Sequence, residues 1–286
     1  MVSLSIITIV FNGERFIEPC IQNVIAQSCP AAEHLIIDGG SSDGTLKIIK
    51  KYAEKYKHIR WVSGKDQGQS DAMNKGVALA KGSVIGFLNV DDYYSPGVLN
   101  EVLGIFDQLP EPSIVLGDCT TWNDDEQIVS IYHVPKRLRA SDLLLGPEVC
   151  PHPPNPSAYF YHKCLHEEIK GFDLNDHYTM DLDFLYKALE KARVHCVNKM
   201  WGNFRFIRGT KTYQDCASGL STSRIKMKLL QYRKKLVFSE KLKILPHFLV
   251  WNALLFFKQG FVRTLFYAGH PKEIVGLAKR KLLKVK

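Results

Sequence analysis

The first hundred residues alternate apolar β-type runs with amphipathic helical segments, and this order constrains the fold more than any other feature of the chain. Runs rich in Ile, Val and Leu predict four strands, at 3–11, 34–40, 59–64 and 83–90. Apolar residues at helical spacing predict three helices between them, over 16–26, 45–56 and 70–80. Strand-helix-strand repeats favour an α/β protein with a mostly parallel sheet flanked by helices, and with ligands bound at the carboxyl edge of the strands.

Polar side chains collect where each of the four predicted strands ends. Because parallel strands end at one edge of a sheet, these side chains should converge on one crevice. A single one of them could simply cap a helix or form a turn, as Ser42 or Asp43 is expected to do for the helix that begins at Thr45. Such a role is a poor explanation for the whole set, which consists of Asn12, Glu14, Asp38, Asp66, Asn89, Asp91 and Asp92.

The chain lacks the two glycine-rich loops that commonly hold nucleotide phosphates. It has no G-x-x-x-x-G-K-[ST] run, and no G-x-G-x-x-G follows the first strand. A phosphorylated ligand would then be neutralised by Mg²⁺ or Mn²⁺, which needs only one or two protein carboxylates when phosphate oxygens and waters complete its shell. Asp91 is the main candidate ligand for that cation, and Asp38 and Asp66 suit hydrogen bonds to a base or a ribose.

Four motifs in the first half resemble those of a known enzyme family. In chain order they are S-I-I-T-x-x-F-N, I-I-D-G-G-S-S-D-G-T, D-x-G-x-x-D-A-M-N-K-G and G-F-L-N-V-D-D. They are similar to the motifs of inverting family 2 glycosyltransferases of GT-A fold, especially those that build bacterial O-antigens and exopolysaccharides. The resemblance covers 3–106 strongly and 151–210 more loosely.

This resemblance implies a metal-dependent enzyme that moves a sugar from a UDP- or GDP-linked donor to a hydroxyl of a glycan or lipid-linked acceptor. It also implies a GT-A domain over 1–221, with a nucleotide-sugar-binding half at 1–106 and an acceptor and catalytic-base half at 107–221. The residues at donor-binding positions are Thr8, Phe11, Asn12, Glu14, Asp38, Gly40, Asp66, Gly68, Met73, Asn74, Lys75, Asn89 and Val90.

The metal motif of the family, D-x-D, corresponds here to Asn89-Val90-Asp91. The first aspartate is replaced by Asn89, whose neutral oxygen is a weaker ligand, so the metal-binding role falls mainly on Asp91 with help from Asp92. The replacement also supports an alternative hypothesis, in which the chain is a catalytically degenerate protein of the same fold that only binds a nucleotide or a membrane.

The second half is expected to supply the catalytic base and the acceptor site. The segment around Gly171-Phe172-Asp173, followed by acidic residues at Asp181 and Asp183, resembles the family's GxFDE…EDYDL region. Either carboxylate could deprotonate the acceptor hydroxyl, and we favour Asp181. Because the two residues are two positions apart on a helix, their side chains lie on different faces of it. A surface role at a helix N-terminus is the alternative for both.

Other polar residues of the second half are candidates for the acceptor or the diphosphate. The Pro-rich stretch 150–156 predicts a loop that places His152 and Asn155 near the acceptor. The run F-R-F-I-R-G-T-K-T carries three cations, Arg205, Arg208 and Lys211, which resemble a closing segment of the family that meets the diphosphate. A solvated basic loop is an equally good description of that run.

The charge of the chain is concentrated in its last quarter. From 224 to 286 there are 16 Lys and Arg against 2 Asp and Glu, whereas the whole chain carries a net charge of +9. We predict a basic amphipathic helical extension over 222–286 that binds an anionic membrane surface, since its aromatic and aliphatic residues alternate with cations. Packing on the domain or on a second subunit is the alternative, the oligomeric state is open, and nucleic acid is not expected as a partner.

The expected location is cytoplasmic, at the inner face of the membrane. Seven cysteines without C-x-x-C spacing indicate a reduced setting, and the N-terminus reads as a first strand and not as a signal peptide. The longest apolar block, 244–257, is short of the ~20 residues that span a bilayer.

Overall fold

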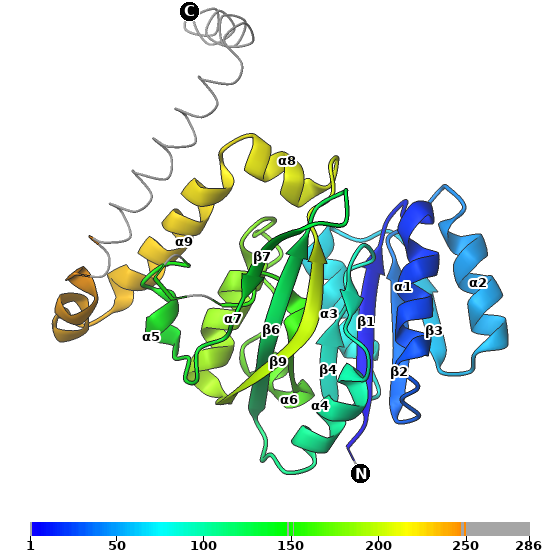
Figure 1. The fold of residues 1–286 in the computed structure, drawn as a ribbon, viewed down its shortest axis with the longest axis horizontal. Coiled ribbons are helices and arrows are strands. Elements are labelled where there is room, and N and C mark those ends of the chain that lie inside the picture. Colours follow the sequence, from blue (N-terminus) through cyan, green and yellow to red (C-terminus); the bar gives the residue numbers. More distant parts are fainter. Residues whose placement is uncertain (1, 148, 151, 247–248, 250–286) are drawn as a thin grey trace, which may run out of the picture.

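One nine-stranded sheet runs through the protein in the order β3-β2-β1-β4-β8-β6-β9-β5, with β7 paired to β6 (Figure 1). The computed structural model describes residues 2–147, 149–150, 152–246 and 249. The strands are β1 (Leu4–Val10), β2 (Ala32–Asp38), β3 (Ile59–Ser63), β4 (Val84–Phe87), β5 (Tyr93–Tyr94), β6 (Ser113–Trp122), β7 (Ile128–Tyr132), β8 (Tyr159–His162) and β9 (Arg193–Arg205).

The four predicted strands of the first half form the parallel part of the sheet. β1 pairs in parallel with β2 and with β4, and β2 pairs in parallel with β3. Their carboxyl ends therefore lie at one edge, as the sequence predicts. β4 ends at Phe87, three residues earlier than predicted, because the N–H of Asp92 bonds to the carbonyl of Asn89 at 3.0 Å and closes a turn there.

The second half continues the same sheet. β8 lies antiparallel between β4 and β6, while β9 runs parallel to β6 and carries β5 on its other side. The two halves expected at 1–106 and 107–221 therefore share one sheet. As a result, the end of β9 reaches the edge where β1, β2 and β4 end.

Two helical layers cover the sheet (Figure 1). One face packs against α1, α2 and α4, and the other against α3, α6, α7 and α9, as the three clusters of buried apolar side chains show. The helices are α1 (Glu14–Ala26), α2 (Thr45–Lys55), α3 (Gln69–Leu79), α4 (Val98–Phe106), α5 (Ala140–Leu143), α6 (Lys163–Glu168), α7 (Met180–Lys191), α8 (Lys211–Ala217) and α9 (Ser221–Lys235), with a 3₁₀ turn η1 (Pro156–Ala158).

α9 is part of the folded unit, although the sequence prediction assigned it to a separate tail. Leu229 is fully buried, and the ring of Tyr232 stacks on Tyr186 of α7 with centroids 3.7 Å apart. The ammonium of Lys228 bridges the carboxylates of Asp176 at 2.7 Å and Asp183 at 3.2 Å. The predicted boundary at 221/222 thus falls at the start of a helix that packs on α7.

The rest of the predicted tail continues with helical residues 238–246, and its remaining residues, 247–248 and 250–286, lie outside the described part of the chain. Within the described residues, no helix combines the length and the hydropathy needed to cross a membrane.

We expect Lys228→Met to destabilise the protein by about 2 kcal/mol, because it removes the ammonium that pairs with Asp176 and leaves Asp183 with Lys187 as its ion-pair partner. Urea unfolding followed by circular dichroism measures this change. The control is Lys234→Met on the exposed side of the same helix, which should change stability by no more than about 0.5 kcal/mol. Equal stability of the two variants would contradict the role given to Lys228.

Candidate functional site

Three adjoining cavities follow the edge of the sheet where β1 and β4 end. The edge cavity, of about 520 Å³, lies between Phe11, Asp66 and Asp91. The central cavity, of about 420 Å³, shares Gln69, Asn89, Phe204 and Lys211 with it and reaches Asp181. The distal cavity, of about 510 Å³, begins at Asp181 and extends to His152. Side chains from both halves of the chain therefore line one continuous hollow.

A buried carboxylate organises the acidic turn after β4. Asp92 is only 3% exposed, and its Oδ2 accepts hydrogen bonds from the amides of Asn89 at 3.0 Å and Asn155 at 2.7 Å. Its Oδ1 accepts from the backbone N–H of Arg205 at 2.9 Å. Burial and the neighbouring charge of Asp91 raise the pKa of Asp92 well above its usual range, against these hydrogen bonds. Both oxygens of Asp92 already accept from protein donors, so the main metal-binding role falls on Asp91, and help from Asp92 stays a prediction.

The same contacts explain why Asn89 replaces the usual aspartate. Its side-chain amide donates to the Asp92 carboxylate, and a carboxylate at this position would face Asp92 with a second negative charge. Asn89 itself lines the edge and central cavities. The replacement therefore fits the hydrogen bonding of this turn.

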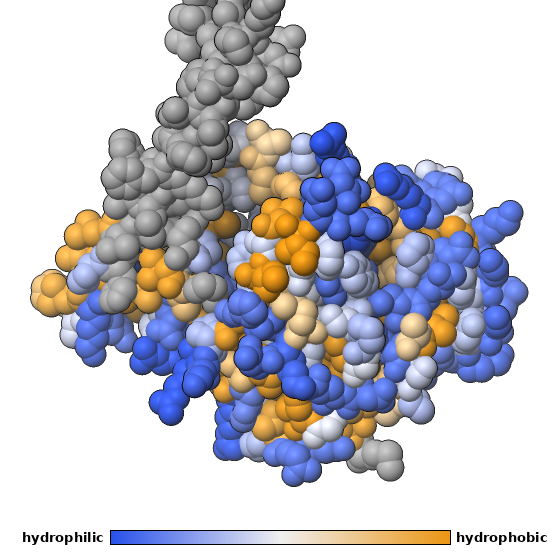
Figure 2. All heavy atoms as spheres, viewed as in Figure 1, coloured by the Kyte–Doolittle hydropathy of each residue, from blue (hydrophilic) through white to orange (hydrophobic). Residues whose placement is uncertain are grey.

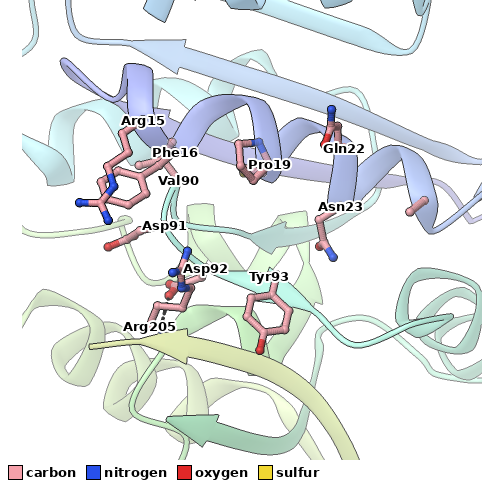
Figure 3. Close-up of a pocket in the computed structure, with 12 residues that line it drawn as sticks. Arg15, Phe16, Pro19, Gln22, Asn23, Val90, Asp91, Asp92, Tyr93 and Arg205 are labelled. Carbon is pink, nitrogen blue, oxygen red and sulfur yellow. Dashed lines mark hydrogen bonds between the residues drawn. The ribbon is translucent and has the colours of Figure 1, made fainter. Parts of the chain in front are cut away.

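Asp91 is the carboxylate of the turn that faces open space. It lines the edge cavity and a smaller one of about 420 Å³ between α1 and β9, where Asp91, Asp92 and Arg205 form one wall and Arg15 and Phe16 of α1 the other (Figure 3). Burial raises the pKa of Asp91, and the nearby charge of Arg205 opposes that rise. Among the predicted metal ligands, Asp91 is thus the one positioned to accept a cation.

The predicted residues that follow β1 lie at the exposed rim of the edge cavity. Phe11 is 66% exposed and lines the cavity. Asn12 accepts from the N–H of Ser42, and Glu14 from the N–H of Gly44, so both side chains tie the end of β1 to the turn before α2. They shape this rim rather than pointing into the cavity.

The residues that follow β2 and β3 take two different positions. Asp38 is buried, and its carboxylate accepts from Gly40, Ser41 and Ser63, so it orders a turn in which Gly40 has a positive φ of 87°. Its contact with a donor stays a prediction. Asp66 lines the edge cavity, and its Oδ1 accepts from the N–H of Gly68, whose φ of 117° suits glycine.

Four predicted donor-binding side chains have other partners in the structure, so their contact with a donor stays a prediction. Thr8 is buried and bonds to His34 at 2.9 Å on the α1 side of the sheet. Met73 is a core residue of α3. Asn74 bonds to the backbone of Phe172 and thereby joins α3 to the second half. Lys75 pairs with Asp71 at 2.7 Å on the surface of α3.

Asp181 and Asp183 face different sides of α7, as their spacing predicts. Asp181 lines the central and distal cavities, and its Oδ1 is buried without a hydrogen-bond partner among the described residues. Burial raises the pKa of Asp181 to about 6, while Lys211 opposes this shift. The carboxylate of Asp183 is held by Lys187, Lys228 and Tyr232. Of the two candidate bases, Asp181 is therefore the one that lines the cavities, and its role as the base stays a prediction.

Of the other predicted residues of the second half, some line a cavity and one does not. His152 lines the distal cavity, and Asn155 lines the central and distal cavities while it caps η1 and bonds to Asp92. Arg205 lies beside Asp91, whereas Arg208 pairs with Asp124 and lines none of the three cavities. A contact between Arg208 and the diphosphate is therefore not supported.

Sequence reasoning missed several side chains of the central cavity. Gln69 begins α3, and Phe204 lies one residue before Arg205 on β9. Two cations contact the ring of Tyr178, with Arg224 3.5 Å and Lys211 4.9 Å from its centroid. Only the neighbouring motif residues gave a signal for Gln69 and Phe204, and the sequence around Tyr178 gives none.

Solved structures of similar shape share this fold. S. aureus TarS 1–349 in complex with UDP-GlcNAc matches with a TM-score of 0.65 at 18% identity, over 86% of this chain and 71% of that one. The mannosyltransferase PcManGT from Pyrobaculum calidifontis, in complex with GDP-Man and Mn²⁺, matches with a TM-score of 0.60 at 15% identity, over 86% and 68%. The sheet and its helical layers are those of the GT-A fold, as predicted.

Comparison of sequences identifies relatives and a family. Uncharacterized glycosyltransferase YibD of Escherichia coli (strain K12) is 30% identical over 51% of this chain and 42% of its own length. Uncharacterized glycosyltransferase EpsJ of Bacillus subtilis (strain 168) is 28% identical over 51% and 41%, so the matched region spans less than half of either relative. The model of glycosyl transferase family 2 matches residues 5–158, more than half of the chain. The chain therefore belongs to glycosyl transferase family 2.

Proposed function

We propose that this protein transfers a sugar from a nucleoside-diphosphate sugar to an acceptor hydroxyl, with inversion at the anomeric carbon. The observation that carries the proposal is the position of Asp181, whose Oδ1 has no hydrogen-bond partner among the described residues and which lines a cavity that adjoins the one containing Asp91. The donor lies in the edge cavity and the acceptor in the central cavity. The two reactants thus meet between Asp91 and Asp181.

Asp181 acts as the general base. It removes the proton of the acceptor hydroxyl as that oxygen attacks the anomeric carbon on the face opposite the leaving diphosphate. A single in-line displacement needs one base and a stabilised leaving group. A pKa near 6 leaves Asp181 ionised at neutral pH while keeping it basic enough to accept the proton.

The residues of the acidic turn fit a divalent cation that is shared with the donor. Among the described residues, no cluster of three or more His, Cys, Asp or Glu forms a cage for a metal. Asp91 provides one available carboxylate, which suits Mg²⁺ or Mn²⁺ when diphosphate oxygens and waters supply the other ligands. Such a cation would neutralise the leaving diphosphate, and Arg205 beside Asp91 adds positive charge on the same side.

The donor class is a UDP- or GDP-linked sugar. Support comes from the two structural neighbours, one in complex with UDP-GlcNAc and the other with GDP-Man and Mn²⁺. A thermal-shift screen of nucleotide sugars with and without Mn²⁺ identifies the donor, because a ligand that binds only the folded state raises the melting temperature.

The acceptor is a glycan, carried by a lipid at the inner face of the membrane, as in the synthesis of O-antigens and other polysaccharides. Support comes from residues 237–249, where apolar side chains are 47–76% exposed at Val237, Phe238, Leu242, Leu245 and Leu249. Lys241 and Lys243 lie exposed among them. Hydrophobic residues also gather over the α9 side in Figure 2, so this region suits peripheral binding to anionic lipid.

Asp181→Asn should lower kcat at least about 10²-fold while the donor still binds, because it removes only the base. In the wild type, log(kcat/KM) should fall as the pH drops below about 6, where Asp181 becomes protonated. Asp183→Asn is the matched control and should retain the pH profile. A folded Asp181→Asn variant with normal turnover would rule out this assignment.

Asp91→Asn should abolish the Mn²⁺ dependence of donor binding, as measured by calorimetry with the nucleotide sugar at several Mn²⁺ concentrations. Asn89→Asp is the informative companion: because it places a carboxylate against Asp92, we expect lower stability and no gain in metal affinity. Tighter Mn²⁺ binding by a stable Asn89→Asp protein would contradict this account of the turn.

Replacing Lys241 and Lys243 together by Ala should weaken binding to phosphatidylglycerol vesicles by roughly tenfold or more, at ~1 kcal/mol per basic residue near the surface. Vesicle co-sedimentation measures the change. The control pair, Lys47→Ala and Lys50→Ala on exposed α2, should have no effect. Equal binding of the wild type to neutral phosphatidylcholine vesicles would argue against electrostatic attachment.

A further inference from the structure

The hollow continues beyond the catalytic base, on the side away from the donor. The central and distal cavities share eight lining residues, among them Tyr132, Tyr178 and Asp181, so they form one groove with Asp181 between its two ends. Each cavity alone falls within the ~300–1,000 Å³ typical of a small-molecule site. When one reacting sugar lies beside Asp181, the distal cavity is therefore free to hold the group attached to that sugar.

The walls of the distal cavity combine aromatic faces with polar groups. Tyr132 and Tyr159 contribute rings, while Thr222 contributes a hydroxyl. This mixture suits a sugar, whose C–H face packs on aromatic rings and whose hydroxyls need hydrogen-bond partners.

Two hydroxyls along the groove lack partners in the structure. Tyr159 Oη, beside the distal cavity, and Thr121 Oγ1, beside the central cavity, are buried without a hydrogen-bond partner among the described residues. Their residues are 2% and 6% exposed. Because a buried polar group that stays unpaired is costly, both hydroxyls call for a partner such as a ligand hydroxyl.

We propose that the distal cavity is a second acceptor subsite, which binds the sugar adjacent to the reacting one. This inference rests on the proposed function, because it takes the central cavity as the place of the reacting sugar. The edge cavity holds the donor, so the remainder of the acceptor leaves Asp181 in the opposite direction, into the distal cavity. The acceptor is then an oligosaccharide of at least two sugars, recognised through both.

The test is sugar transfer by the full chain to immobilised glycans of one to four sugars, in pairs that share the same terminal sugar. Donor hydrolysis without an acceptor is measured in parallel. Thr222→Trp places an indole in the distal cavity, and Ser223→Trp, at the adjacent exposed position that lines none of the three cavities, is the matched control. Tyr159→Phe removes only the unpartnered hydroxyl.

We expect glycans of two or more sugars to be labelled at least about tenfold faster than the matching monosaccharide, the ratio expected for one further hydrogen-bonded contact. Thr222→Trp should remove this advantage, while its donor hydrolysis and labelling of monosaccharides stay unchanged. Ser223→Trp should keep the advantage. Tyr159→Phe should raise KM for the longer glycans several-fold and leave the KM for the donor unchanged.

Equal labelling of short and long glycans would overturn the proposal, and so would an unchanged preference in Thr222→Trp. Hydrolysis of the donor without labelling of any glycan would also overturn the proposal. Labelling that depends on a long alkyl chain and not on the number of sugars would assign the distal cavity to a lipid instead. A protein that neither binds nor hydrolyses any nucleotide sugar would refute the proposed function itself, which is a separate result.

Discussion

The carboxylate of Asp92 joins three segments that are distant in the sequence. Its donors come from Asn89 in the turn after β4, Asn155 at the start of η1 and the backbone of Arg205 at the end of β9. A carboxylate buried in this way is stable only with such partners. Once they are in place, Asp91 faces the edge cavity, Asn155 borders the other two cavities, and Arg205 lies beside Asp91. The geometry of the site therefore depends on this interaction.

A second set of charges holds the other side of the groove. Lys228 of α9 bonds to Asp176 before α7 and to Asp183 within it. Although burial would raise the pKa of Asp176, hydrogen bonds from Lys228 and Thr179 lower it to about 2. These contacts fix the start of α7, and Asp181 lies between the two anchored carboxylates. Asp183 thus has structural partners on this helix, while Asp181 remains available for chemistry.

Much of the fold could be predicted from sequence because its strands and first helices obey local rules. The apolar runs and turn residues of the first half placed β1 to β4 within a few residues, and their shared edge followed from the topology. The antiparallel insertion of β8 between β4 and β6 depends on contacts far apart in the chain, so no local pattern indicated it. The packing of α9 on the domain was only the alternative to membrane binding, because its basic composition resembles that of an exposed helix. In the structure, Leu229 and Lys228 of α9 face α7 and the segment before it.

The candidate site was predictable in its motifs but not in the direction of each side chain. Asp91 and Asp181, which the motifs indicate, both line the cavities, yet the orientations of Thr8, Asp92 and Asp183 are set by partners that only the folded chain brings together. The central claim is a single displacement by a hydroxyl that Asp181 deprotonates. The most direct test is the anomeric configuration of the product, measured by proton NMR during turnover. We predict the configuration opposite to that of the donor sugar, and retention would contradict this mechanism.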